Sequence, residues 1–252
     1  MKHLFSLSAA ATAAFTLCIS TASAADLAVL SAGAIEPGIK AAAAAFEKQT
    51  GHSVNITFNT APELRKRMAG SPAFDVVIAP PAVISDFATD NKLAAARATV
   101  GRVGMGVAVR DGAPVPDIAT ADAVKASVLA AESLVFNRAS TGLYLEGLLK
   151  KMDIYTQIES KTTRYADGAS VLEHVIKGKG REVGFGAMTE ILLSTGKGLR
   201  LVGPLPEEIQ NYTSYTAAPL STGEQQSLAQ QFVMFLSGPV GKPLFVAAGI
   251  TD

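Results

Sequence analysis

The chain has 252 residues, with 22 basic and 22 acidic side chains, 48% hydrophobic residues and a single cysteine. Such a balanced charge argues against a surface for nucleic acid or for an anionic membrane, so we expect no nucleic-acid partner. The length fits one large domain or two lobes of about a hundred residues each.

The first 24 residues have the pattern of a secretory signal peptide. An apolar run from Leu4 to Ile19 follows Lys2, and Ala22-Ser23-Ala24 supplies the small residues that a signal peptidase requires. Because the run is short and is interrupted by Ser and Thr, an uncleaved membrane anchor is the less favoured alternative. Cleavage before Ala25 predicts a periplasmic protein of 228 residues, which has lost Cys18 and therefore forms no disulfide.

Short apolar runs alternate with helical patterns through the first half of the mature chain. Pro37 and Gly51 mark the start and the end of the first predicted helix. Gly104 and Gly106 would allow the chain to change direction, so we place the first crossing between lobes near them. The predicted strands are 26–31, 53–58, 74–79 and 103–109, and helices are expected at 35–50, from 63 to 68 and through 83–87.

The second half continues the same alternation, which predicts mostly parallel α/β sheets. We interpret 212–218 as the strand that returns to the first lobe. The other predicted strands are 133–136, 162–166, 183–185 and 199–202, and the helices are 120–131, a segment ending at 152, a segment through 171–175, 188–194, 223–236 and a last helix ending near 248.

One stretch, Phe136 to Met152, has the features of an anion site. A predicted strand ends in a polar turn that contains Arg138, Ser140 and Thr141, and a helix with one apolar face follows. A helix N-terminus leaves backbone N–H groups unpaired and carries partial positive charge, so it binds anions readily. We therefore predict that this turn forms one wall of a ligand cleft, with Ala32-Gly33-Ala34 as the facing wall.

Several segments together resemble a known family. The first predicted helix reads AAAAAFEKQTG, a later strand reads FDVVIAPP, and the chain closes with LAQQFVMFLSGPVGKPLFVAAGI. In this order they resemble the periplasmic solute-binding proteins of ABC importers, and most of all the molybdate-binding protein. The resemblance implies an α/β, two-lobed periplasmic-binding-protein (type II) fold, in which each lobe is a mostly parallel sheet flanked by helices and the ligand cleft lies between the lobes. We assign 1–24 to the signal peptide, 25–105 and 216–252 to lobe 1, and 106–215 to lobe 2.

The resemblance also implies where the ligand is contacted. The family's first ligand turn carries a Ser hydroxyl where this chain has Ala34, and its Ser-rich second turn corresponds to Thr60-Ala61-Pro62. The third and fourth contacts are backbone N–H groups, matched by Thr141 and by Gly168 or its neighbour. The fifth is a Tyr hydroxyl at a position that falls near Ala187.

Three of these five donors are altered, and in the second turn only Thr60 keeps a hydroxyl, so other groups must replace the lost hydroxyls. A bidentate arginine would favour a carboxylate or a larger oxyanion over molybdate. The predicted ligand-binding residues are Ser31, Gly33, Ala34, Thr60, Ala61, Arg65, Arg138, Ser140, Thr141, Gly168 and Ala187.

The main functional prediction is an extracytoplasmic solute-binding protein that captures a small anion and delivers it to an ABC permease in the inner membrane, as a monomer. A molybdate- or tungstate-binding importer subunit is an alternative. A periplasmic sensor that signals to a membrane partner is an alternative of another class.

An enzyme is not predicted. The mature chain contains His52 and His174 but no cysteine, so no Cys/His or Ser/His/Asp set can be assembled, and the two histidines lack metal-ligand spacing with carboxylates. The 177–180 segment lacks the order of a phosphate-binding loop. We therefore expect no metal and no cofactor, and catalysis by Ser140 with a lysine base is the remaining enzymatic alternative.

Overall fold

The computed structural model describes residues 24–70, 73–94 and 96–251. The predicted signal peptide, 1–24, lies outside this range except for Ala24. Within the described part of the chain, no helix has the length and apolar character needed to cross a membrane.

Strands and helices alternate along the chain, as the sequence pattern predicts. The strands are β1 (Asp26–Ala32), β2 (Ser53–Asn59), β3 (Val76–Ala79), β4 (Ala98–Arg110), β5 (Ser133–Asn137), β6 (Thr162–Tyr165), β7 (Glu182–Ala187), β8 (Leu199–Pro204) and β9 (Tyr212–Pro219). The α-helices are α1 (Glu36–Thr50), α2 (Ala61–Ala69), α3 (Pro81–Thr89), α4 (Ala121–Ala130), α5 (Ser140–Lys151), α6 (Tyr155–Ile158), α7 (Gly168–Lys177), α8 (Met188–Ser194), α9 (Gln226–Ser237) and α10 (Gly241–Ala247), and short 3₁₀ turns are η1 (Gly33–Ile35), η2 (Glu159–Lys161) and η3 (Glu207–Ile209).

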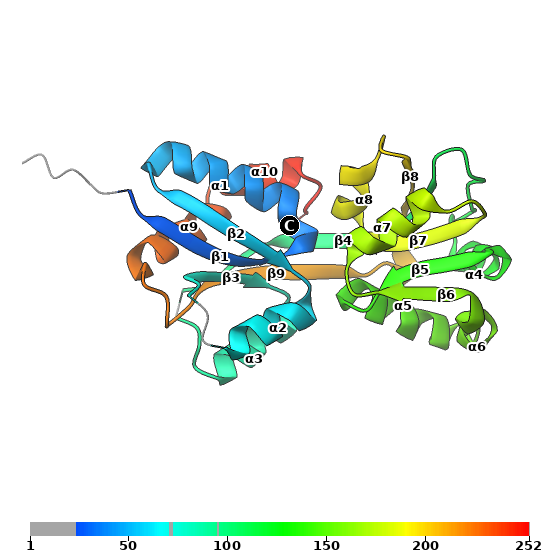
Figure 1. The fold of residues 1–252 in the computed structure, drawn as a ribbon, viewed down its shortest axis with the longest axis horizontal. Helices are drawn as coiled ribbons and strands as arrows, with labels where there is room; N and C mark the ends of the chain where they lie inside the picture. The colour runs from blue at the N-terminus through cyan, green and yellow to red at the C-terminus, as the bar shows by residue number, and fades with distance from the viewer. Residues whose placement is uncertain (1–23, 71–72, 95, 252) are drawn as a thin grey trace, which may run out of the picture.

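The chain folds into two lobes, which confirms the predicted two-lobed α/β class (Figure 1). In the first lobe β1 pairs in parallel with β2 and β3, while β9 and β4 are antiparallel to their neighbours. In the second lobe β5 pairs in parallel with β6 and β7, and β4 is antiparallel to β7 and β8. Both sheets are therefore mixed, because the connecting strands run against the parallel ones.

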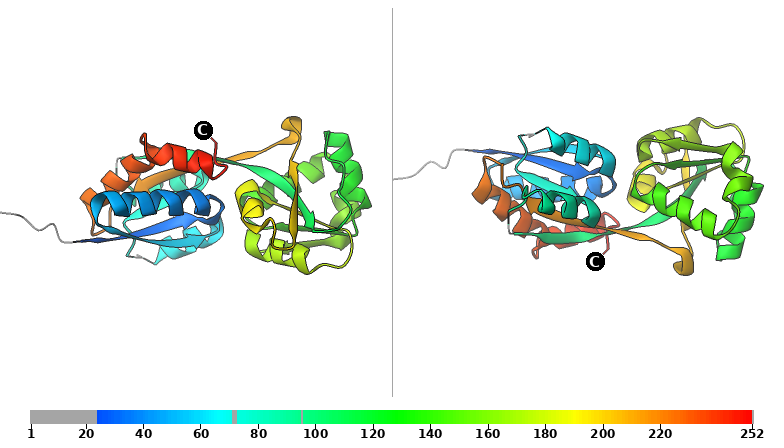
Figure 2. Two further views of the ribbon diagram at one scale, coloured as in Figure 1. Left: turned by 90° about the horizontal axis from the view of Figure 1, so that it is seen from above. Right: turned by 90° about the horizontal axis from the view of Figure 1, so that it is seen from below.

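Strand β4 joins the lobes. Its first half, 98–104, pairs with β9, and its second half pairs with β7 and β8. Figure 2 shows β4 and β9 crossing together from one lobe to the other. Gly104 and Gly106 lie inside this continuous strand, and the residue with a positive φ is Gly101 (132°), next to a bulge.

Each lobe has its own apolar core. The first lobe packs the 27–103 strands and helices against α9 and α10, with Phe46 in edge-to-face contact with Phe232. The second lobe has one apolar cluster on the face covered by α4, α5 and α6 and another beneath α7 and α8. Along β4, Val103 belongs to the apolar core of the first lobe and Met105 to a core of the second lobe. This change lies next to the boundary between the lobes that we propose between residues 105 and 106.

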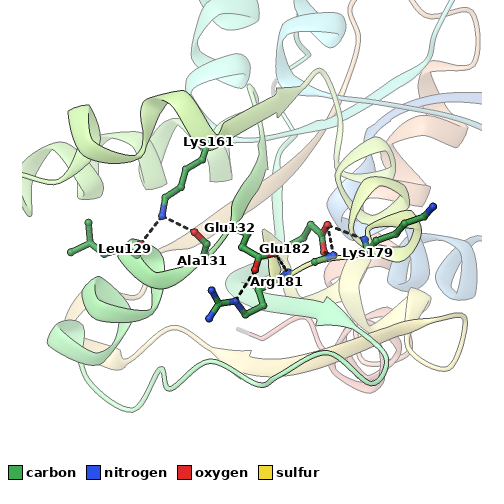
Figure 3. A network of polar contacts seen from close by, with 8 residues as sticks. Leu129, Ala131, Glu132, Lys161, Lys179, Arg181 and Glu182 are labelled. Carbon is green, nitrogen blue, oxygen red and sulfur yellow. Dashed lines mark hydrogen bonds and ion pairs between the residues drawn. The ribbon is translucent and has the colours of Figure 1, made fainter.

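A network of polar contacts connects neighbouring chain segments at the end of the second lobe where β5 and β7 begin (Figure 3). Lys161 Nζ donates to the carbonyl oxygens of Leu129 and Ala131 at 2.6 and 2.7 Å. The carboxylate of Glu182 accepts from the backbone N–H groups of Lys179 and Gly180 at 3.0 Å. The glycine-containing 177–180 segment is thus bound to the chain's own carboxylate.

Asp75 connects two distant parts of the first lobe. It is 5% exposed, and its carboxylate accepts from the backbone N–H groups of Ala28 in β1 and Gln225 at the start of α9, both at 2.9 Å. Because this buried carboxylate accepts from two partly buried N–H groups at once, it fixes α9 against the sheet.

We expect Asp75→Ala to lower the free energy of unfolding by about 2 kcal/mol or more, since two partly buried N–H groups lose their acceptor. Urea unfolding followed by circular dichroism measures the change. The control is Asp86→Ala, which removes an exposed ion pair with Arg65 and should change stability by less than about 1 kcal/mol. Equal effects of the two substitutions would contradict the connecting role.

Candidate functional site

A cavity of about 440 Å³ lies between the two lobes, within the size range of small-molecule sites. Its walls come from turns that follow the carboxyl ends of strands, the usual ligand position in open α/β sheets. The lining residues are Ala32, Gly33, Ala34, Glu36, Phe58, Asn59, Thr60, Ala61, Glu63, Pro80, Asn137, Ala139, Ser140, Thr141, Ala166, Asp167, Gly168, Ala169, Leu172, Ala187, Glu190, Leu193, Ser194 and Tyr215.

Most of the predicted ligand-binding residues line this cavity. The turn after β1 and the start of α2 form the wall of the first lobe, and the starts of α5, α7 and α8 form the wall of the second lobe. Both predicted walls, the 136–152 turn and the 32–34 turn, therefore face the same space. The predicted residues in the lining are Gly33, Ala34, Thr60, Ala61, Ser140, Thr141, Gly168 and Ala187.

Three predicted residues do not line the cavity. Ser31 is fully buried in β1, and its hydroxyl donates to the carbonyl oxygen of Ala32. Arg65 lies on an exposed face of α2 and pairs with Asp86 at 2.7 Å. Arg138 is exposed, and its backbone N–H continues the pairing of β5 with β6 by donating to Tyr165. Within the described part of the chain, no arginine lines the cavity to supply the charge that we expected to replace the missing hydroxyls.

The start of α5 is organised by Asn137, the last residue of β5. Its Oδ1 accepts from the backbone N–H groups of Ala139 and Gly142 at 3.0 and 3.1 Å, and its Nδ2 donates to the Thr141 hydroxyl at 3.1 Å. A Cβ atom on Gly142 would lie 1.8 Å from the Asn137 carbonyl oxygen, so the turn requires glycine there. This buried amide fixes the cleft wall.

The described residues of the lining include four carboxylates and no Lys, Arg or His. Each carboxylate belongs to the start of a helix: Glu36, Glu63 and Glu190 lie in the first turns of α1, α2 and α8, and Asp167 is the N-cap of α7. An acidic residue at a helix start stabilises the helix by compensating its partial positive charge. Of the helices that begin at the cavity, α3 and α5 have neither an acidic residue in the first turn nor an acidic N-cap. Because α3 begins with Pro80 and Pro81, which have no N–H group, the start of α5 offers more N–H groups to a ligand.

Glu190 is the carboxyl group with the most unusual surroundings. Its Oε2 lies against Gly168, where a Cβ would be only 2.1 Å away, and its Oε1 lies 3.7 Å from the Cβ position of Gly33 in the other lobe. Burial, followed by the negative charges of Asp167 and Glu36, raises its pKa from 4.5 to about 7, although the Ala187 N–H donates to it. At neutral pH, Glu190 is therefore present in both its protonated and its ionised form.

Tyr215 contributes from β9, in the strand pair that joins the lobes. Its side chain is 4% exposed and lines the cavity. Burial, with a further contribution from the charge of Glu190, raises the pKa of its phenol, so the hydroxyl keeps its proton. Tyr215 thus lines the cavity from β9, whereas Ala187, near the position where the resemblance implied a tyrosine, has no hydroxyl group.

The lobes also meet directly beside the cavity. The hydroxyl of Thr189, which is fully buried in α8, donates to the carbonyl oxygen of Ala34. This bond fixes the start of α8 against the 32–34 turn. The carboxyl group of Glu190, the next residue along, is consequently directed to the boundary between the lobes.

The family of the chain follows from a comparison with protein-family models. The model described as bacterial extracellular solute-binding protein matches residues 27–251. The chain therefore belongs to the bacterial extracellular solute-binding proteins, which confirms the predicted class. Membership implies a location outside the cytoplasm.

Two solved structures share the fold of this chain, and they and a sequence relative are named for different ligands or activities. The periplasmic molybdate-binding protein of Azotobacter vinelandii superposes with a TM-score of 0.73 at 16% identity, over 90% of this chain and 99% of that one. The sulfate-binding protein SubI of Mycobacterium tuberculosis H37Rv gives 0.73 and 16%, over 90% and 86%. A protein of Pseudomonas sp. named aconitate isomerase is 28% identical over 218 residues, which cover 84% of this chain and 82% of the relative.

We expect Asn137→Ala to lower the free energy of unfolding by about 2 kcal/mol, because it leaves the buried N–H of Gly142 without an acceptor. Chemical unfolding monitored by circular dichroism provides the measurement. Asn55→Ala, at an exposed position of β2, is the matched control and should change stability by less than about 0.5 kcal/mol. A loss at position 137 no larger than the control's would contradict the capping role.

Glu190→Gln should stabilise the protein above pH 7 and have little effect near pH 4.5. The folded state raises the pKa of this carboxyl from 4.5 to about 7, so folding stability from Glu190 is present below pH 4.5 and is lost as the pH rises through 7. We expect a gain of about 1–3 kcal/mol at pH 8 and a much smaller one at pH 5. Urea unfolding at both pH values measures it, and a gain independent of pH would exclude the charge as its cause.

Proposed function

We propose that the protein captures a small carboxylate anion in the cleft and presents it to an ABC permease. The proposal rests on one observation: two groups that can bind a carboxylate, the start of α5 and Glu190, line the same cavity. The start of α5 offers backbone N–H groups with no acidic residue beside them, and Glu190 can offer a protonated carboxyl group. A ligand with two carboxylates would be bound at one end by the helix start and at the other by the carboxylic acid.

The same features disfavour tetrahedral oxyanions. The residues in the positions of the family's hydroxyl groups include Ala34, Ala61 and Ala187, and all three line the cavity without a donor side chain. Molybdate and tungstate have no long axis with which to contact both α5 and Glu190. The name of the Pseudomonas relative also points to a carboxylate, since aconitate is a tricarboxylate.

Isothermal titration calorimetry tests the ligand class. We expect cis-aconitate, trans-aconitate or the saturated tricarboxylate tricarballylate to bind with a Kd in the micromolar range, which corresponds to about 8 kcal/mol. Molybdate, tungstate and sulfate at the same concentrations should bind at least tenfold more weakly. Tighter binding of any of these three oxyanions than of every carboxylate would contradict the proposal.

A second candidate function is isomerisation of an unsaturated carboxylate. Two observations favour it: the relative named aconitate isomerase, and a cleft carboxyl group whose pKa of about 7 suits proton transfer at neutral pH. Such a reaction needs neither metal nor cofactor, and no group of three or more His, Cys, Asp or Glu residues in the described chain could bind a metal ion. Interconversion of cis- and trans-aconitate, followed by ¹H NMR, separates an isomerase from a binding protein.

A further inference from the structure

We propose that Glu190 is a catalytic residue that transfers a proton to and from a carbon atom of a bound unsaturated carboxylate, so that the cleft shifts a carbon–carbon double bond. This inference rests on the carboxylate-binding proposal above. It assigns a chemical role to a residue that has no counterpart among the ligand contacts expected from sequence.

The position of the carboxyl group is the first argument. Glu190 lines the cavity, and its two oxygen atoms lie beside Gly168 in one lobe and Gly33 in the other. Because both neighbours are glycines, their side chains do not separate the carboxyl group from the ligand space. A ligand bound between the lobes would contact it directly.

The partners of Glu190 are the second argument. Buried carboxylates are ordinarily paired with a cation. The titratable and charged groups that face Glu190 are Asp167 at the start of α7, Glu36 in the first turn of α1 and Tyr215 in β9. The N–H of Ala187, the N-cap residue of its own helix α8, donates to it. None of these groups is a cation, so an ion pair does not hold the carboxyl in its ionised state. A carboxyl that changes protonation near neutral pH meets the requirement of a general acid–base group.

The proposed shift of the double bond needs only Glu190 and the ligand, because the same proton is removed and returned. Ionised Glu190 accepts a proton from a CH₂ group that lies between a C=C bond and a carboxylate, so one C–H bond breaks. The electron pair moves into the allylic system, and the negative charge spreads onto the ligand's carboxylate. Protonated Glu190 then returns the proton to the other end of the allylic system, where a new C–H bond forms and the double bond has moved. No electron is lost or gained overall.

The start of α5 can stabilise the charge that develops in this step. Its first turn contains no acidic residue, and it lies at the same cavity as Glu190. Partial positive charge at a helix start favours an anion whose charge increases during the reaction. Tyr215, which keeps its proton, is a further hydroxyl at the cavity.

Proton exchange in D₂O tests the inference directly. With cis-aconitate as the probe, wild-type protein should replace the CH₂ hydrogens by deuterium, as seen by ¹H NMR, at a rate that rises with pH through about 7 as Glu190 ionises. Glu190→Gln should lower that rate at least 100-fold, the effect typical of a lost general base. Binding of the saturated tricarballylate, measured by calorimetry, should persist within about tenfold.

Two further variants separate catalysis from folding. In Gly168→Ala the new Cβ would meet Glu190 Oε2 at 2.1 Å, so the flexible carboxyl end must move while the chemical group is kept. We expect exchange to fall at least tenfold, with a thermal midpoint close to wild type. Glu207→Gln, on the exposed turn η3 and outside the cavity lining, is the matched control and should exchange like wild type.

The outcomes distinguish this inference from the proposed function. Wild-type protein that binds tricarballylate but exchanges no hydrogen overturns the catalytic role and leaves carboxylate capture standing. Exchange that survives Glu190→Gln unchanged also overturns it. If no carboxylate binds and no exchange occurs, both proposals fall together.

Discussion

The cleft depends on one electrostatic interaction, in which carboxylates balance the partial positive charges at the N-termini of helices. Parallel strands direct the starts of α2, α5, α7 and α8 toward one cavity, and partial positive charges gathered in this way must be balanced. The chain balances most of them with its own carboxylates, in the first turns of α1, α2 and α8 and at the N-cap of α7. The start of α5 has only the neutral amide of Asn137 beside it, and burial, followed by the nearby negative charges, raises the pKa of Glu190.

The geometry of the two lobes keeps these groups together while leaving room for a ligand. The lobes have separate apolar cores and are joined by the β4 and β9 pair. Beside the cavity, the Thr189 hydroxyl and the Ala34 carbonyl connect α8 directly to the opposite lobe. Closure by bending at such a strand pair is the usual motion of two-lobed binding proteins. It would bring both walls onto the ligand and exclude water from the space around Glu190.

Binding and proton transfer need much the same site. A carboxylate ligand requires donors, and a carboxyl group that retains its proton near neutral pH is a donor as well as an acid. A fold used for solute capture can therefore acquire a reaction through one side chain without a new scaffold, because chemistry belongs to sites and not to folds. The 28% identity to a protein named aconitate isomerase is consistent with such a step.

The sequence alone determined the alternation of strands and helices and the turns that line the cleft, because hydrophobic period and turn residues are local properties. The resemblance of whole segments, and not their periodicity, indicated the family. Only the tertiary structure decided the electrostatics of the cleft. Arg65 and Arg138 lie outside it, since a side chain's direction depends on the packing of the whole element. The place of Tyr215 near the returning strand already suggested that it could line the cleft, whereas Glu190 looks from sequence like an ordinary first-turn acid. Glu190 became a candidate site residue because the fold brings together segments as far apart as Thr189 and Ala34, which are separated by 155 positions.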